Sequence, residues 1–192
     1  MEIDVKNIKA AYKTATESGK TLLAALFPDL PLGQADTEKN KRPITERIKT
    51  FNDACLMTEG KTAEEWEEEN ETEKMDTDVL AFLKLRIVCA ALNDGWEPQF
   101  TEDEWRWYPW FLLWTEEELA DKDDDWKKSH SLREVSDRRT TYAGFAFALS
   151  YDAPSNTDSS LGSRLCLKSE ALADYCGHQF IDLWLDFCLP RK

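Results

Sequence analysis

The feature that most constrains the fold is a tryptophan-rich stretch between residues 96 and 114. It reads W-E-P-Q-F-T-E-D-E-W-R-W-Y-P-W-F-L-L-W and holds five of the eight tryptophans of the chain. Aromatic side chains bury large areas, so much of the core must be built around this stretch. Pro98 and Pro109 exclude one continuous helix. We therefore expect an extended aromatic strand over residues 107–114, with Pro109 near its start or on a sheet edge.

The chain before this stretch has helical periodicity. Residues 5–27 predict one amphipathic helix, and a polar loop follows over residues 29–42. Pro43 suits the first turn of a second helix, which we expect to end before Gly60. Both helices are amphipathic, so each predicts one face packed against a core.

An acidic segment and a central helix come next. Thr62 and Glu65 form a capping-box pattern ahead of a run of glutamates. Residues 78–93 are apolar around nearly the whole helical circumference, which is typical of a buried helix. Gly95 lies just past the end of this helix, where a C-terminal cap is expected.

Two further capping-box patterns flank the aromatic strand, at Thr101–Glu104 and at Thr115–Glu118. The second predicts an acidic helix that continues to about Trp126. Residues 127–140 are charged and read as irregular.

The last third of the chain predicts two strands and a helix. Residues 141–151 alternate large and small side chains, which is the period of a strand. A turn-rich loop over 152–162 leads to a second strand over 163–168, and Ser169 caps a final helix. The large side chains of the first strand are expected to share one face: Phe145, Phe147, Leu149 and Tyr151.

These elements predict an α+β fold in a single domain over residues 1–192. The part over 1–95 is mainly helical. The part over 96–192 holds the aromatic strand, the hairpin and the C-terminal helix. The sheet is expected to contain about three antiparallel strands packed with helices.

The net charge of the chain restricts the kinds of partner that it can bind. The net charge of −14 disfavours direct binding to nucleic acid, which depends on phosphate neutralisation, and disfavours an anionic membrane. It favours a protein partner with a basic surface. No long apolar run or secretory signal is present, and the five cysteines read as reduced core residues. We expect a cytoplasmic protein of the host cell, and a virion component assembled there would look the same.

Motifs for catalysis, cofactors and metals are weak. E-S-G-K-T at 17–21 resembles the end of a phosphate-binding loop but lacks the required glycine five residues before Gly19. Cys166, Cys176 and His178 have no common zinc spacing, and the aspartates over 121–125 lack the pattern of a calcium loop. We therefore predict no catalytic, cofactor-binding or metal-binding residue, and no enzyme.

Contact residues are expected on three surfaces. The first is an exposed aromatic edge, the second is the 152–162 loop, and the third comprises the acidic segments over 64–78 and 116–125. The candidate partner-binding residues are Trp105, Trp107, Trp110, Asn156, Asp158, Glu67, Glu68 and Asp124.

Four blocks of this sequence resemble a widespread family of uncharacterised proteins from gut bacteria, their tailed phages and prophages. The resemblance implies a phage or mobile-element origin and carries over no functional residue. The G-S-R-L strand at 162–165 is also similar to the final strand of C-type-lectin-like domains. The four blocks are I-T-E-R-I-K-T-F-N-D-A (44–54), L-K-L-R-I-V-C-A-A-L-N-D-G-W-E-P-Q-F (83–100), W-Y-P-W-F (107–111) and G-S-R-L-C-L-K-S-E-A-L-A-D-Y-C-G-H-Q-F-I-D-L-W-L-D-F (162–187).

Three functions remain open at this point. The first is a non-enzymatic binding or assembly protein of a phage or mobile element, acting through protein–protein contacts that include self-association into a homo-oligomer. The second is an acidic inhibitor of a host defence nuclease, which would mimic nucleic acid. The third is a hydrolase with carboxylates that no motif identifies.

Overall fold

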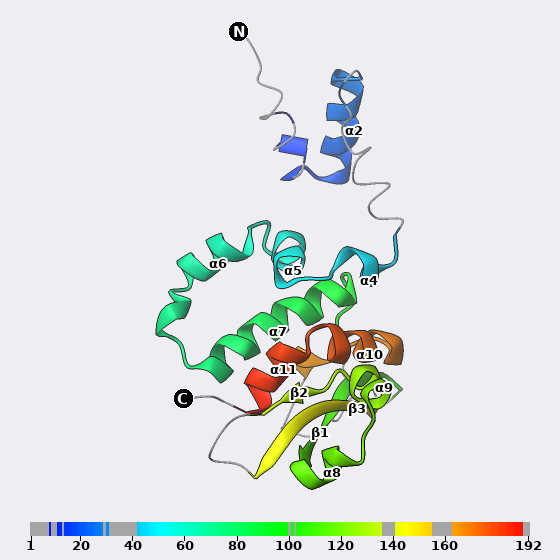
Figure 1. Cartoon of the computed structure of the whole chain (residues 1–192). Coiled ribbons are helices and arrows are strands. Elements are labelled where there is room, and N and C mark those ends of the chain that lie inside the picture. Colours follow the sequence, from blue (N-terminus) through cyan, green and yellow to red (C-terminus); the bar gives the residue numbers. More distant parts are fainter. Residues whose placement is uncertain are drawn as a thin grey trace. The chain divides into compact units, whose positions relative to one another are not determined.

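The structure is a computed structural model that describes residues 8, 11–12, 14–28, 30, 42–99, 101, 103–135, 141–154 and 163–189. The chain forms two compact units, Met1–Pro43 and Ile44–Lys192 (Figure 1). The predicted single domain over 1–192 stays a prediction.

The first unit contains α2 (Glu17–Leu26). The prediction of one helix over 5–27 is wrong, because the helix is interrupted at Ala15 and Thr16. Thr16 has extended backbone, and its hydroxyl accepts a hydrogen bond from the Gly19 N–H at 3.3 Å. A threonine that caps a new helix in this way competes with continuation of the old one. Most of the predicted loop over 29–42 lies outside the described residues.

The second unit begins with two short helices, α4 (Ile44–Arg47) and α5 (Phe51–Thr58). We predicted one helix here. Thr50 divides it, because Thr50 and Asp53 form a capping box. The Asp53 N–H donates to the Thr50 hydroxyl at 3.1 Å, and the Thr50 N–H donates to the Asp53 carboxylate at 2.9 Å. The capping-box pattern T-F-N-D over residues 50–53 is present in the sequence, so the break between α4 and α5 was predictable.

The central helix of the unit is α7 (Thr77–Asn93), which follows α6 (Ala63–Glu69) and the short 3₁₀ helix η1 (Thr72–Lys74). The capping box at Thr62 and Glu65 is confirmed. α7 ends at Asn93 and is followed by Asp94 and Gly95, which both have positive φ. Its buried residues are Ala81, Leu85, Ile87, Val88, Cys89, Ala91, Leu92 and Asn93.

The sheet confirms the predicted α+β class. Its antiparallel strands lie in the order β1-β3-β2. β1 is therefore an edge strand, as Pro109 predicted, since proline cannot donate a ladder hydrogen bond. The strands are β1 (Trp105–Thr115), β2 (Arg133–Glu134) and β3 (Tyr142–Pro154).

The third strand does not come from the predicted segment. Residues 163–168 form the 3₁₀ helix η2 (Ser163–Leu165) and one antiparallel bridge between Leu167 and Trp107. β2 arises instead within 127–140, which we predicted to be irregular. Asn93 at the end of α7 fixes the 166–168 segment, because its side-chain amide donates to the Cys166 carbonyl at 2.9 Å and accepts from the Lys168 N–H at 3.0 Å.

The capping patterns around β1 have different outcomes. Thr115 and Glu118 form a capping box, as predicted. Thr101 and Glu104 do not open a helix; the Glu104 carboxylate accepts from the Gln99 N–H at 2.8 Å in a turn before β1. Predicted long helices are again divided, at Asp123 and at Phe180. The resulting helices are α8 (Glu116–Ala120), α9 (Asp124–Ser129), α10 (Glu170–Gln179, capped by Ser169) and α11 (Ile181–Cys188).

A β-bulge in β3 decides which side chains face the core. Trp110 pairs with Leu149, whereas the next residue, Phe111, pairs with Phe147, so Ala148 is the extra residue. The extra residue shifts the alternation of the strand by one position. The prediction that Phe145, Phe147, Leu149 and Tyr151 share a face is therefore wrong. Phe145 and Phe147 are buried, and Leu149 and Tyr151 are exposed.

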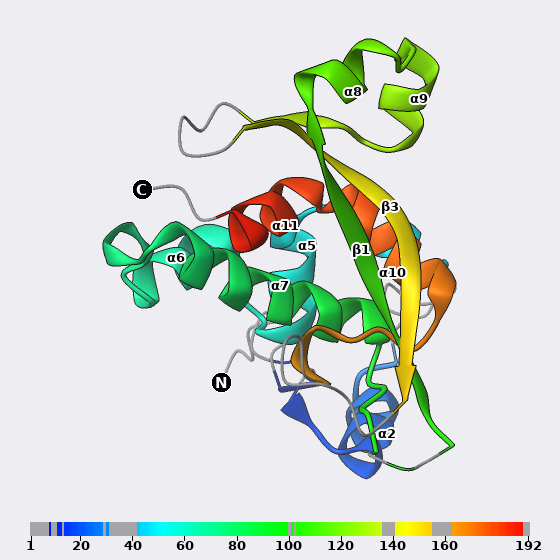
Figure 2. The same cartoon turned by 90° about the horizontal axis from the view of Figure 1, so that it is seen from below.

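Helices cover one face of the sheet, which we call the inner face. Here Phe111 stacks on Phe145 with ring centroids 4.7 Å apart and lies 5.5 Å from Trp184 of α11. α10 and α11 separate the sheet from α7, and α5 packs on α7 (Figure 1). The core therefore fills the space between the inner face and α7. The opposite face, the outer face, is covered by α8 and α9 at one end of the β1–β3 pair (Figure 2).

Candidate binding surface

An apolar patch lies on the outer face of the sheet. Trp110 and Leu112 are two residues apart on β1 and so share a face, and Trp110 pairs with Leu149 of β3. The Tyr151 ring lies 6.3 Å from the Trp110 ring. We define these four residues, Trp110, Leu112, Leu149 and Tyr151, as the outer-face patch; their exposed fractions are 52%, 45%, 49% and 58%.

The patch is a gap in an otherwise covered row of side chains. On the same face of β1, Tyr108 is buried on one side of the patch. On the other side, the Trp114 ring lies 5.0 Å from the Trp126 ring of α9, and the Lys122 ammonium lies 4.9 Å from the Trp114 ring. The protein thus covers its outer face at both ends and leaves the middle bare.

α8 explains why the cover stops where it does. A Cβ on Gly144 of β3 would lie 2.7 Å from Leu119 Cδ1 and 2.8 Å from Leu132 Cδ1. α8 therefore sits directly on the backbone at Gly144. The helix is only five residues long and is succeeded by the turn to α9. It is too short to extend over Leu112 and Trp110.

The tryptophans predicted to bind a partner do not form one surface. Trp110 belongs to the outer-face patch. Trp107 packs against the core and bridges Leu167, with its N–H and C=O both bonded at 2.9 Å. Trp105 is exposed, but it lies at the start of β1 on the face opposite Trp110.

Acidic residues border the patch at the α8–α9 end. Residues 115–129 contain seven acidic and three basic residues. Glu116, Glu117, Asp124 and Asp125 are exposed in the first turns of the two helices. Glu118 is held in the capping box, where hydrogen bonds from the Thr115 N–H and hydroxyl lower the pKa of its carboxyl. We call residues 115–129 the acidic rim.

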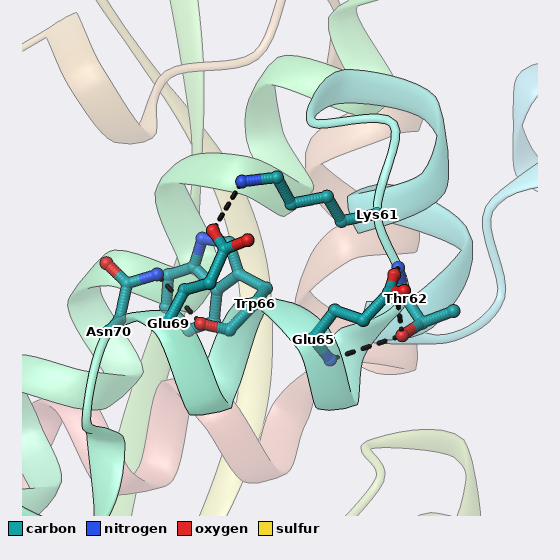
Figure 3. A network of polar contacts seen from close by, with 6 residues as sticks. All are labelled: Lys61, Thr62, Glu65, Trp66, Glu69 and Asn70. Carbon is teal, nitrogen blue, oxygen red and sulfur yellow. Dashed lines mark hydrogen bonds and ion pairs between the residues drawn. The ribbon is translucent and has the colours of Figure 1, made fainter.

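The acidic segment at α6 is partly neutralised within the protein. Glu67, a predicted contact residue, accepts from the Lys84 ammonium at 2.5 Å, and Glu69 pairs with Lys61 (Figure 3). Glu65 closes the capping box, and hydrogen bonds from Thr62 lower the pKa of its carboxyl. Glu68, the other predicted contact, is exposed. Asn156 and Asp158 lie outside the described residues.

A small hollow lies between α5, α6 and α7. Its volume is about 300 Å³, at the lower end of the range for small-molecule sites. Trp66, Leu83, Ile87 and Ala90 form its apolar lining. Arg86 and Glu59 bring opposite charges to it, so the hollow has no single electrostatic preference.

The buried cysteines are poor candidates for catalytic residues. Cys55, Cys89, Cys166 and Cys176 are buried as predicted, whereas Cys188 is exposed. Burial raises the pKa of Cys55 and of Cys166 to about 11. A hydrogen bond with Cys176, together with burial, raises the pKa of Cys89. Thiols with such pKa values stay protonated near pH 7 and are poor nucleophiles.

Two serine–histidine contacts lie in the described part of the chain, between Ser131 Oγ and His178 Nδ1 at 2.8 Å and between the neighbours Ser129 Oγ and His130 Nδ1 at 3.0 Å. A catalytic triad also needs a carboxylate on the ring. Asp174, one turn before His178, accepts from the Ser150 hydroxyl at 2.7 Å instead. Within the described part of the chain no carboxylate is hydrogen-bonded to His178, and no group of three or more His, Cys, Asp and Glu residues could hold a metal ion.

The fold and this surface define an α+β protein with a partly bare sheet face. Comparison with known proteins finds no family model, no curated protein and no solved structure that matches the chain. Among the residues that the structure describes, no helix has the length and apolar character needed to cross a membrane.

Sequence reasoning found one member of the outer-face patch and missed the other three. Leu112 was placed in the aromatic strand but not among the contact residues, and Leu149 and Tyr151 were expected to share a face with Phe145 and Phe147. Only the bulge at Ala148 moves them to the outer face, and no local sequence signal marks that bulge.

Proposed function

We propose that this chain is a non-enzymatic binding or assembly protein that contacts another protein through the outer-face patch. The observation that carries the proposal is the exposure of four large apolar side chains in one cluster, on a face that the protein covers elsewhere. Contiguous exposed apolar patches on proteins mark interaction sites, whereas single exposed apolar residues are ordinary. Trp and Tyr are also the side chains most often found at the energetic centre of interfaces.

The proposed biological origin and location of the protein depend on the sequence. Resemblance to phage and prophage proteins supports a phage or mobile-element origin, with action in the host-cell cytoplasm. The alternative of a nucleic-acid-mimicking nuclease inhibitor receives less support, because Lys84 and Lys61 pair with the acidic residues of α6. The hydrolase alternative also receives less support, since the ring of His178 packs on Phe147 with centroids 4.1 Å apart and no carboxylate among the described residues is hydrogen-bonded to it.

A site-specific photo-cross-linking experiment tests the proposal. The full chain is made in its natural host cells with a photoreactive phenylalanine at position 110, 151 or 56. Leu56 on α5 is the control, because it is 49% exposed and lies outside the patch. We expect the same cross-linked protein from positions 110 and 151, and its absence from position 56. Identical products from all three positions, or none from 110 and 151, would contradict the proposal.

A further inference from the structure

We infer that the partner presents an apolar ridge flanked by lysines or arginines, as a basic amphipathic helix does. This inference rests on the proposed function and deepens it, because it names the chemistry of the partner.

The patch is too small to be a whole interface. A specific protein–protein interface uses about 20–30 residues on each side, with an apolar centre and a polar rim. The four patch residues are enough for such a centre. The contact must therefore extend onto neighbouring surface, and at one end the neighbouring surface is the acidic rim.

The acidic rim has unused charge next to the patch. Trp126, which packs on Trp114, directly follows Asp124 and Asp125. Both aspartates are exposed, and the carboxylate of Asp123 before them is occupied as the cap of α9, accepting from the Trp126 N–H at 2.7 Å. The Lys122 ammonium already lies over the rings of Trp114 and Trp126, and the other two basic residues of the rim, Lys127 and Lys128, lie in the last turn of α9. Seven acidic residues against three basic ones leave the rim with a net negative charge. The edge of the patch is thus negative.

Charge separates the candidate occupants. A second copy of this chain would bring another molecule of net charge −14 and a second acidic rim to the contact. Like charges across an interface cost free energy, so a second copy is disfavoured. An acidic helix is disfavoured for the same reason. A segment with apolar and basic residues satisfies the patch and the rim together.

Two designed peptides test this inference with the full-length protein. Both form an amphipathic helix with the same leucine face and contain no tryptophan; one has lysines on its flanks and the other has glutamates. Binding is measured by fluorescence anisotropy of a dye on the peptide. At 50 mM NaCl we expect the lysine peptide to bind at least about tenfold more tightly than the glutamate peptide, and the ratio to fall at 500 mM NaCl.

Matched variants distinguish the contributions of the outer-face patch, the acidic rim and the net charge to peptide binding. Trp110→Ser, or Tyr151→Ser if the first variant does not fold, should weaken binding of the lysine peptide by about tenfold or more. The rim variant Asp124→Asn with Asp125→Asn should weaken it about threefold to tenfold. The control variant Glu64→Gln with Glu68→Gln removes the same charge from α6 and should change it less than about twofold.

The peptide-binding results test the basic partner separately from the proposed function. Equal binding of both peptides, or equal weakening by the rim and α6 variants, overturns the basic-partner inference. Concentration-dependent dimers that Trp110→Ser abolishes would assign the patch to a second copy and also overturn it. In each of these cases the shared cross-link at positions 110 and 151 would still support the proposed function, and its absence would reject that function separately.

Discussion

A single glycine sets how closely α10 packs on the sheet. A Cβ at Gly177 would lie 2.6 Å from Phe147 Cδ2 and 2.8 Å from Pro109 Cβ. Gly177→Ala should therefore destabilise the protein by about 1–3 kcal/mol, although alanine favours a helix by about 1 kcal/mol over glycine. Urea unfolding measures the change. Adding Phe147→Leu should recover part of the loss; equal stability of Gly177→Ala and the natural protein would contradict the packing.

The ring of His178 makes the stability of the protein depend on pH. Burial lowers the pKa of its ring below the ordinary value of 6.5. The unfolded chain then binds the proton more readily than the folded chain, so stability falls as the pH drops through about 6.5. The lowered pKa values of Glu65 and Glu118 act only below their ordinary value of 4.5, so the two windows are separate. We expect His178→Gln to flatten the free energy of unfolding between pH 7 and pH 5.5, as followed by urea titrations; an unchanged slope would contradict this.

At the scale of elements, the bulge in β3 builds the outer-face patch. Deleting Ala148 would let Leu149 follow Phe147 directly in the ladder opposite Trp110 and Phe111, so Leu149 and Tyr151 would stay on the outer face. The deletion therefore removes the bulge without turning a large side chain toward α10. We expect the deletion variant to keep cooperative unfolding in circular dichroism, and Ala148→Ser to change stability by no more than about 0.5 kcal/mol. A deletion variant that loses cooperative unfolding would contradict Ala148 as the extra residue.

Elements were predictable where the determining signal is local. Pro109 placed β1 at an edge, and the boxes at Thr62 and Thr115 start α6 and α8, because each depends on residues within one turn. The break at Thr50 was missed although its signal is equally local. The bulge and β2 could not be predicted in this way, since both are defined by cross-strand pairing with residues far along the chain. For the same reason the sequence indicated an aromatic contact surface and its member Trp110, but not the other three residues of the outer-face patch.

Net charge acts on the whole molecule. At a net charge of −14, repulsion among the carboxylates opposes the compact state. Salt screens this repulsion, with a Debye length of about 10 Å at 0.1 M. We expect the midpoint of thermal unfolding to rise by a few degrees between 20 mM and 300 mM NaCl. Calorimetry at pH 7 checks this, with potassium chloride as the control for ion-specific effects; a fall in the midpoint would show that ion pairs such as Arg133–Asp182 outweigh the repulsion.

The division of the chain into two compact units predicts that the second unit keeps its stability without the first. Among the described residues, the main core cluster and the side chains packed on it all lie between Ile44 and Leu189. A chain that begins at Ile44 therefore keeps every one of these contacts. We expect its free energy of unfolding to match that of the second unit in the full chain within about 0.5 kcal/mol, the usual error for independent sites. Urea unfolding of both chains, followed by tryptophan fluorescence, measures this directly, because all eight tryptophans lie after residue 43. A loss of several kcal/mol would instead support the single domain over 1–192 that the sequence predicts, with residues 1–43 as part of its core.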